Sequence, residues 1–354
     1  MELQINQTAT PKPKPDWDHL GFGDYFSDHM LLIEYTTGKG WHDARIVPYG
    51  PVSMEPSAMV LHYAVEVFEG LKAYACPDGK IRMFRPLSNA ARLNRSAARF
   101  CCPALPEDVF VDTLCRLIKV DKDWIPKAEN TSLYIRPFMY SDQSNVGVRI
   151  PDSYRFVVIL SPVGAYYPEG LNPVKIYVED EYVRASKGGT GFTKCGGNYA
   201  ASLIAQKKAK DMGFTQVLWL DGVERKYIEE VGTMNVMFKI KGEIVTPELG
   251  DSILPGVTRE SCIQLLRSWG LSVTERKLSI DELYEAARNG DLEEAFGTGT
   301  AAVISPIGLF SIRGEKLQVQ DGGIGAVSQR LYDTLTGIQW GKLPDPYGWT
   351  LEVG

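Results

Sequence analysis

The sequence predicts a protein of mixed α/β class that folds as two domains. At 354 residues the chain exceeds the size at which a single hydrophobic core usually keeps growing. Its composition, 44% hydrophobic and 23% charged, is ordinary for a folded globular protein. Strand-like apolar runs and segments of helical periodicity both occur along the whole chain. These observations favour two compact units that each combine helices with strands.

The first predicted domain, residues 17–165, has α+β character, and residues 1–16, rich in Pro and Lys, predict a flexible tail ahead of it. Two helices are expected, at 88–101 with Ser88 as the cap and at about 109–120. A turn at 77–79 joins two of the strands as a hairpin. The predicted strands are apolar runs bounded by turn signals, at residues 29–35, 71–74, 81–84, 132–136 and 154–160.

A linker at residues 166–180 is expected to lead into a larger second domain at 181–354. The boundary itself is expected in the Pro- and Gly-bearing stretch 161–173, as is usual for domain boundaries. Short apolar runs predict strands at 174–178, 216–220, 234–240 and 243–246. Longer periodic segments predict helices at 199–210, 259–269, 280–289 and 327–340.

Charge and composition exclude several classes of function. The formal net charge of −6 argues against a nucleic-acid partner, because phosphate binding requires a basic surface. No stretch approaches the roughly 18 to 20 apolar residues that span a bilayer, and the N-terminal residues lack an apolar signal core. The six cysteines form no regular framework, which favours reduced thiols and a cytoplasmic protein.

The distribution of histidines narrows the chemistry further. All four histidines lie at or before His62, so the second domain contains none. A hydrolytic triad or a zinc site in that domain would normally use imidazole, and no metal site is predicted. Candidate catalytic groups are therefore Lys, Tyr, Arg and carboxylates.

The segment 187–199 is the densest unusual stretch of the chain. Five glycines bracket Lys194 directly ahead of a predicted helix. Glycine permits a close backbone approach, which suits a loop beneath a cofactor. The residues alone fit a flexible surface turn with a solvated lysine equally well. No complete G-x-G-x-x-G motif opens a helix and no phosphate loop occurs, so a nucleotide-binding fold gains little support.

Eight segments of the chain carry recognisable motifs, at residues 68–73, 84–86, 132–137, 163–166, 193–199, 227–235, 254–259 and 296–301. In this order and spacing they resemble the branched-chain amino-acid aminotransferases of the fold-type IV pyridoxal 5′-phosphate (PLP) group. The resemblance covers nearly the whole chain, from about Phe22 to the C-terminus, and implies a larger C-terminal lobe with a β-barrel-like core.

The resemblance implies a set of cofactor-binding residues. Lys194 is the catalytic lysine, whose amine holds the aldehyde of PLP and moves the proton during transamination. Glu230 faces the pyridine nitrogen, and Tyr199 hydrogen-bonds the phenolic oxygen of the cofactor. The phosphate group is expected to bind Arg92, Val257, Thr258 and Thr300. Taken singly, an arginine on a helix such as Arg92 is more often a solvated one.

The resemblance also implies the substrate-binding residues. The amides of Thr300 and Ala301 are expected to receive the α-carboxylate, and Arg136 to receive the second carboxylate of glutamate. The alternative for Arg136 is a strand-end arginine in a structural ion pair. The walls of the side-chain pocket match Phe22, Phe68, Tyr134, Tyr166 and Thr233. Tyr63 and Val146 match positions that reach in from a partner subunit, so a homodimer is expected.

The expected function is PLP-dependent transamination of leucine, isoleucine or valine with 2-oxoglutarate. The nearest alternatives share the fold: a D-amino-acid aminotransferase and an aminodeoxychorismate lyase. A non-catalytic binding protein on the same fold is a third alternative, against which Lys194, Glu230 and Tyr199 speak. The expected partners are amino acids and 2-oxo acids.

Overall fold

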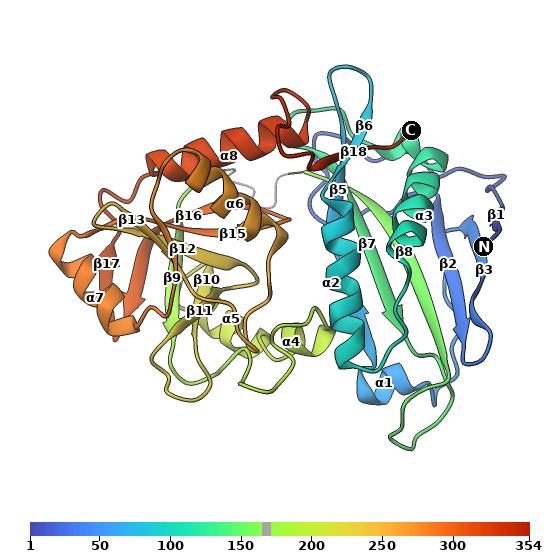
Figure 1. Ribbon diagram of the computed structural model, residues 1–354, viewed down its shortest axis with the longest axis horizontal. Coiled ribbons are helices and arrows are strands. Elements are labelled where there is room, and N and C mark those ends of the chain that lie inside the picture. Colours follow the sequence, from blue (N-terminus) through green and yellow to red (C-terminus); the bar gives the residue numbers. More distant parts are fainter. Residues whose placement is uncertain (165–170) are drawn as a thin grey trace. The chain divides into compact units, whose positions relative to one another are not determined.

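The computed structural model describes residues 1–164 and 171–354, which form two compact units (Figure 1). Unit 1 comprises Met1–Pro168, Thr193–Gly196 and Gly337–Gly354, and unit 2 comprises Glu169–Phe192 and Gly197–Thr336. The stretch 161–173, in which the sequence places the boundary, includes residues 165–170, which lie outside the described residues. The return of the last residues to unit 1 is not apparent from the sequence.

Unit 1 is built on a nine-stranded sheet in the order β1-β3-β2-β8-β7-β5-β6-β18, with β4 paired to β7. Strands β1 and β3 run parallel, and the other pairs are antiparallel. The strands are β1 (Leu3–Ile5), β2 (His29–Thr36), β3 (Gly40–Pro48), β4 (Glu66–Phe68), β5 (Leu71–Ala75), β6 (Ile81–Phe84), β7 (Ser132–Tyr140), β8 (Ser153–Val163) and β18 (Thr350–Glu352).

Residues 1–16, expected as a flexible tail, are instead hydrogen-bonded to unit 1. Strand β1 adds to the sheet edge, with Leu3 opposite Ala44. Farther along, the Lys12 amide donates to Asp28 Oδ1 (2.8 Å), and Lys12 Nζ donates to the Ser27 carbonyl (2.8 Å). The Pro- and Lys-rich composition suggested solvent exposure, but these polar partners on the approach to β2 hold the segment in place.

The helices of unit 1 are α1 (Met59–Tyr63), α2 (Pro86–Arg99), α3 (Glu107–Val120) and the 3₁₀ turn η1 (Lys122–Trp124). In Figure 1, α2 and α3 lie over the same face of the sheet. The prediction that Ser88 caps α2 is wrong: Arg85 is the N-cap and Pro86 is the first helical residue. Proline suits that position because its fixed φ is helical and it has no N–H left unsatisfied.

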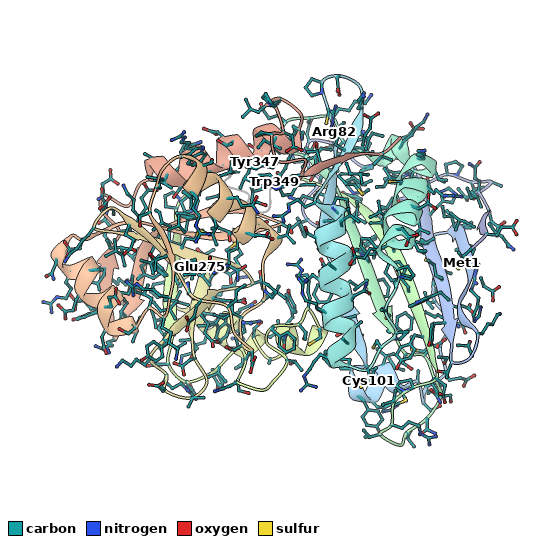
Figure 2. The ribbon with its side chains drawn as sticks, in the orientation of Figure 1. Met1, Arg82, Cys101, Glu275, Tyr347 and Trp349 are labelled. Atoms are coloured by element: carbon teal, nitrogen blue, oxygen red, sulfur yellow. The ribbon has the colours of Figure 1, made fainter. Side chains whose placement is uncertain are left out.

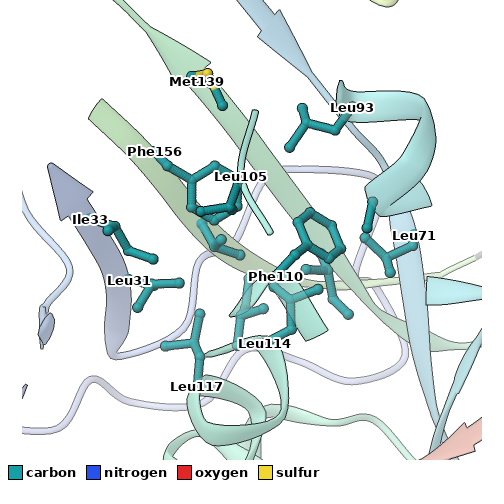
Figure 3. Packing of buried hydrophobic residues seen from close by; sticks show 14 of the residues in the cluster. Leu31, Ile33, Leu71, Leu93, Leu105, Phe110, Leu114, Leu117, Met139 and Phe156 are labelled. Atoms are coloured by element: carbon teal, nitrogen blue, oxygen red, sulfur yellow. The ribbon is translucent and has the colours of Figure 1, made fainter. Parts of the chain in front are cut away.

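The hydrophobic core of unit 1 lies between these helices and the sheet (Figure 3). Phe110 and Leu114 of α3 face Phe156 of β8, and the rings of Phe110 and Phe156 lie 5.9 Å apart between centroids. Leu93 of α2 is fully buried in the same cluster. This packing determines the position of α2, the helix that carries Arg92.

The C-terminal segment 337–354 completes unit 1. Strand β18 pairs with β6, with Thr350 opposite Phe84. Tyr347 and Trp349, labelled in Figure 2, stack with ring centroids 4.3 Å apart, and Trp349 meets Phe84 edge-on at 5.6 Å. Aromatic contacts and a strand edge therefore return the chain end to the first unit.

Unit 2 contains a second nine-stranded sheet in the order β11-β10-β9-β16-β15-β12-β13-β14, with β17 paired to β16. Val231 and Met234 form an antiparallel bridge across the turn between β11 and β12, which stand far apart in that order. The sheet therefore curls back on itself, as the expected barrel-like core requires. Its strands are β9 (Val174–Glu179), β10 (Gln216–Leu220), β11 (Ile228–Val231), β12 (Asn235–Ile240), β13 (Glu243–Thr246), β14 (Val273–Glu275), β15 (Leu292–Gly299), β16 (Val303–Ile312) and β17 (Glu315–Gln318).

The remaining helices are α4 (Gly196–Ala200), α5 (Leu203–Asp211), α6 (Val257–Ser268), α7 (Ile280–Asn289) and α8 (Ala326–Gln339). The single helix expected at 199–210 is divided into α4 and α5. At the break the Ser202 hydroxyl donates to the Tyr199 carbonyl (2.7 Å), and such a local bond competes with helical backbone pairing. No helix within residues 1–164 and 171–354 is long and apolar enough to cross a membrane.

The core beneath α3 yields a stability prediction. Phe110→Ala should lower the free energy of unfolding by about 3 to 5 kcal/mol, because a fully buried ring is replaced by a cavity. Urea unfolding followed by circular dichroism measures the change. The control is Leu87→Ala on α2, where the side chain is 52% exposed and the expected loss is below about 0.5 kcal/mol. Equal losses in the two variants would contradict this account of the core.

Candidate active site

The peptide that carries Lys194 is held on both sides by groups of unit 1. The Lys194 amide donates to Ser96 Oγ on α2 (3.0 Å), and the Phe68 amide donates to the Lys194 carbonyl (2.9 Å). Two residues farther on, the Gly196 amide donates to the Glu66 carboxylate on the same strand as Phe68. Burial raises the pKa of Glu66, while the Gly196 amide and Arg136 act to lower it. The lysine therefore lies on a fixed peptide and not on a loose turn.

The glycine-rich loop around Lys194 is closed by a side-chain pair in unit 2. Thr190 Oγ1 donates to Asn198 Oδ1 (2.8 Å), and Asn198 Nδ2 donates to the Thr190 carbonyl (2.9 Å). Asn198 is 7% exposed and directly precedes Tyr199 on α4. The loop around Lys194 is therefore ordered, which contradicts the alternative of a flexible turn.

Arg92 forms a buried, two-pronged ion pair with Glu69. Arg92 Nε donates to Glu69 Oε1 (2.6 Å) and Nη2 donates to Oε2 (2.8 Å), while Asn89 Nδ2 adds a third bond to Oε2 (2.8 Å). Glu69 is 0% and Arg92 4% exposed. Burial acts to raise the pKa of Glu69, but the charge and hydrogen bonds of Arg92, together with Lys194, hold that pKa below its ordinary value. Arg92 is not a solvated arginine.

Four of the predicted substrate residues meet in unit 1. The Arg136 guanidinium lies over the Phe68 ring (4.6 Å to the centroid) and its Nη2 donates to the Tyr134 hydroxyl (2.9 Å). The Phe22 ring lies 5.1 Å from that of Tyr134. A Cβ atom at Gly70 would overlap the Tyr134 hydroxyl, so only glycine fits there. These side chains form a cationic, aromatic-walled cluster.

The Arg136 cluster includes Lys194. Lys194 Nζ lies 4.9 Å from the centroid of the Phe68 ring, whose other neighbour is Arg136. Arg136 Nε is buried and has no hydrogen-bond partner among the described residues. An ion pair of purely structural purpose, the alternative for Arg136, is not present among those residues either. The guanidinium retains the capacity to receive an anion.

The other predicted substrate residues have different surroundings. The Tyr63 hydroxyl donates to the Val146 carbonyl, which joins α1 to the loop that follows β7, and the Val146 side chain is 66% exposed. Thr233 lies exposed in the turn between β11 and β12. Tyr166 lies outside the described residues.

In unit 2, Glu230 of β11 is buried beside an arginine that the sequence did not single out. Arg184 Nη2 lies 3.1 Å from Glu230 Oε1, and the Leu254 amide donates to the same oxygen (2.7 Å). Arg184 Nη2 also donates to the carbonyls of Gly191 (2.9 Å) and Ser252. No motif identified Arg184, because its partners Glu230, Gly191 and Ser252 lie in three separate segments of the chain.

The loop that follows β13 leads into α6 in a constrained geometry. Asn235 Nδ2 donates to the Leu254 carbonyl (2.9 Å), and a Cβ atom at Gly256 would overlap Asn235 Oδ1. Gly256 is the N-cap of α6, and Val257 and Thr258 form its first turn. Backbone N–H groups at such a turn, with the positive end of the helix dipole, favour a phosphate or carboxylate.

The turn between β15 and β16 carries Thr300 and Ala301, both partly buried. Beside it, Thr298 Oγ1 and Ser305 Oγ are buried hydroxyl oxygens with no hydrogen-bond partner among the described residues. Buried polar atoms are usually satisfied, so hydroxyls in this state indicate a place where a ligand or water belongs. Thr298 and Ser305 were not predicted as site residues, since a hydroxyl in a strand has no distinctive sequence signal.

Comparisons with known proteins agree with this geometry. The amino-transferase class IV family matches residues 66–310. Branched-chain-amino-acid aminotransferase 2 of Bacillus subtilis (strain 168) is 56% identical over 99% of this chain and 97% of its own, and branched-chain-amino-acid transaminase 1 of the same organism is 53% identical over 99% of each.

Solved structures agree as well. The crystal structure of the Escherichia coli branched-chain amino acid aminotransferase has a TM-score of 0.77 at 27% identity, covering 92% of this chain and 99% of that chain. A second branched-chain amino acid aminotransferase, complexed with N-(5′-phosphopyridoxyl)-L-glutamate, has a TM-score of 0.75 at 26% identity, covering 91% of this chain and 98% of that chain.

The buried pair of Arg92 and Glu69 yields a second prediction. Glu69→Gln should lower the free energy of unfolding by about 3 to 5 kcal/mol at neutral pH, because it leaves the Arg92 charge buried and uncompensated. The pKa of Glu69 is depressed, so the contribution of the pair is complete above the ordinary value of 4.5 and is lost as pH falls through the folded-state pKa.

Thermal and urea unfolding at several pH values measure this loss. The control is Asp112→Asn, which removes the exposed Arg116–Asp112 pair on α3 and should cost below about 0.5 kcal/mol. A Glu69→Gln protein as stable as the control would show that the buried pair does not stabilise unit 1.

Proposed function

The chain belongs to the class IV aminotransferases and, within them, to the branched-chain amino-acid aminotransferases, and on this premise we propose how its residues carry out the reaction. It transfers the amino group of leucine, isoleucine or valine to 2-oxoglutarate, with PLP as cofactor. The observation that carries the proposal is the fixed peptide of Lys194 beside the aromatic-walled Arg136.

The donor groups of the chain fit PLP. The cofactor requires an amine, a carboxylate for its ring nitrogen and an anion site for its phosphate, and Lys194, Glu230 and the first turn of α6 provide these chemistries. The unpartnered Thr298 hydroxyl, which has no hydrogen bond within the described residues, adds a buried polar atom that a ligand can satisfy. When bound, PLP withdraws electrons from the substrate Cα, so that its proton becomes acidic.

Lys194 and Glu230 have separate tasks. Lys194 would hold the cofactor through its amine, and the same amine would move the proton between the substrate Cα and C4′ of the cofactor. Its peptide is held by Ser96 and Phe68, so the amine moves only through its own side-chain torsions. Arg184 and the Leu254 amide hold the Glu230 carboxylate in place, and this carboxylate would hold the proton on the ring nitrogen.

The phosphate is assigned to the first turn of α6, with Val257 and Thr258, and to the Thr300 hydroxyl. Arg92 is assigned to it as well, with the orientation of its guanidinium set by Glu69. Tyr199, on α4 directly after Asn198, is assigned to the phenolic oxygen of the ring.

The substrate site must accept an aliphatic side chain and a carboxylate in turn. Phe22, Phe68 and Tyr134 present apolar surface to the aliphatic chain, while Arg136 receives the second carboxylate of glutamate. The amides of Thr300 and Ala301 receive the α-carboxylate. We also assign Thr233 to the pocket, together with Tyr166, which lies outside the described residues. Tyr63 and Val146 are assigned to it from a partner subunit, so we propose a homodimer as the active unit. We propose the cytoplasm as its location.

Reduction of the holoenzyme with borohydride should couple PLP to Lys194 and abolish activity, because only this amine is held in position for the aldehyde. Peptide mapping by mass spectrometry locates the label. Lys187→Ala, which removes another lysine of the same loop, should leave both labelling and activity intact. A label on a different lysine would overturn the assignment of Lys194.

Replacing Arg136 should separate the two half-reactions. Arg136→Met keeps apolar volume but removes the cation, so single-turnover spectra should show leucine reacting at a near-normal rate. The return reaction with 2-oxoglutarate should slow by about two orders of magnitude, since a lost charged hydrogen-bond pair is worth roughly 3 kcal/mol. Arg45→Met, which breaks an ion pair between Arg45 of β3 and Glu34 of β2, serves as control. Equal slowing of both half-reactions would show that Arg136 only supports the fold.

A further inference from the structure

A cavity of unit 2, about 410 Å³ in volume, is lined by none of the residues assigned to catalysis. Its walls come from the turn after β10, the start of β11 and the loop between β13 and α6. Glu229 lines it, whereas its neighbour Glu230 pairs with Arg184. Successive side chains of a strand point to opposite faces, which accounts for the different surroundings of these two carboxylates.

The Glu229 carboxylate has one satisfied and one unsatisfied oxygen. Oε1 accepts a hydrogen bond from the Ser252 hydroxyl, but Oε2 is buried and has no partner among the described residues. The residue as a whole is 6% exposed. A buried acceptor without a donor costs free energy, so this carboxylate favours an occupant that donates a hydrogen bond.

The surroundings of that oxygen define the donor. Acidic residues predominate in the lining, where Asp221, Glu224, Glu248 and Asp251 accompany Glu229 and only Lys187 and Lys277 oppose them. Neither lysine forms an ion pair with Glu229 in the described part of the chain, and Lys277 Nζ instead lies 4.8 Å from the centroid of the Tyr227 ring. The cavity therefore favours a positively charged occupant.

The same cavity offers apolar surface next to the carboxylate. Ile253 is 6% exposed in its lining, and Val223 and Leu249 expose 72% and 45% of their surface at its margin. Large exposed apolar side chains that gather around a cavity commonly mark a binding site. A ligand with both a cationic head and a short apolar chain matches these two kinds of wall.

We propose that this cavity binds a small organic cation, whose ammonium or guanidinium group donates to Glu229 Oε2 while its aliphatic chain contacts Ile253, Val223 and Leu249. Burial raises the pKa of Glu229, and Arg184 opposes this shift, so a bound cation would restore the charge that burial disfavours. Through Ser252, whose carbonyl accepts from Arg184, the occupant also adjoins the residues around Glu230.

The test uses the holoenzyme and butylguanidinium, which carries no primary amine to react with the PLP aldehyde. Isothermal titration calorimetry should show saturable binding of one cation per chain. Butylurea, a neutral molecule of nearly the same shape, should bind at least about tenfold more weakly, because it offers the donors without the charge. This comparison requires no variant, and it is independent of transaminase activity. Absence of saturable binding, or equal affinity for the two compounds, would overturn the proposal.

Two matched variants locate the site. Glu229→Gln should weaken butylguanidinium binding by about tenfold or more, through loss of the buried charge. Glu224→Gln removes an exposed acid of the same lining and should change affinity by less than about threefold. Both variants are first compared with the parent protein by circular dichroism. Unchanged affinity in a folded Glu229→Gln protein would show that the cation binds elsewhere and would overturn the proposal.

Discussion

The buried ion pair of Arg92 and Glu69 is the constraint on which the position of Lys194 depends. Arg92 and Ser96 are four residues apart on α2 and so share one face of the helix. The first pairs with the carboxylate of Glu69, and the second accepts the Lys194 amide. Because Glu69 directly follows β4, whose Phe68 holds the Lys194 carbonyl, helix, strand and lysine peptide are positioned together. Loss of either partner would leave a buried charge uncompensated between α2, β4 and the Lys194 peptide.

Unit 2 contains two adjacent buried carboxylates, Glu229 and Glu230, that have different partners. Glu229 and Glu230 are adjacent in sequence, yet it is Glu230 whose carboxylate pairs with Arg184, whereas Glu229 has a buried oxygen with no hydrogen-bond partner among the described residues. The alternation of strand side chains gives these two neighbouring acids different hydrogen-bond partners. Asn235 and Gly256 then place the α6 turn after the loop that donates to Glu230. One short strand therefore serves the proposed cofactor site on one side and the proposed cation site on the other.

Local patterns predicted most helices and many strands, because apolar periodicity reports which face of an element is buried. They failed where a competing interaction outweighed the pattern. Pro86 moved the start of α2 ahead of Ser88, and the Ser202 hydroxyl divided the helix expected at 199–210. Strands β15 and β16 escaped prediction because their glycines and Pro306 are unfavourable in isolated strands, although pairing within the sheet accommodates them.

The sequence by itself determined the family and the class of reaction, and its motifs singled out Lys194, Glu230 and Arg136 as the proposed site residues. Only the tertiary structure decided their partners. Arg184 contacts Glu230, and Ser96 accepts the Lys194 amide, although each pair lies in segments distant along the chain. The fold likewise leaves one buried oxygen of Glu229 without a partner among the described residues. Motifs preserve local chemistry, whereas the burial and charge that a side chain experiences are set by whatever the fold packs against it.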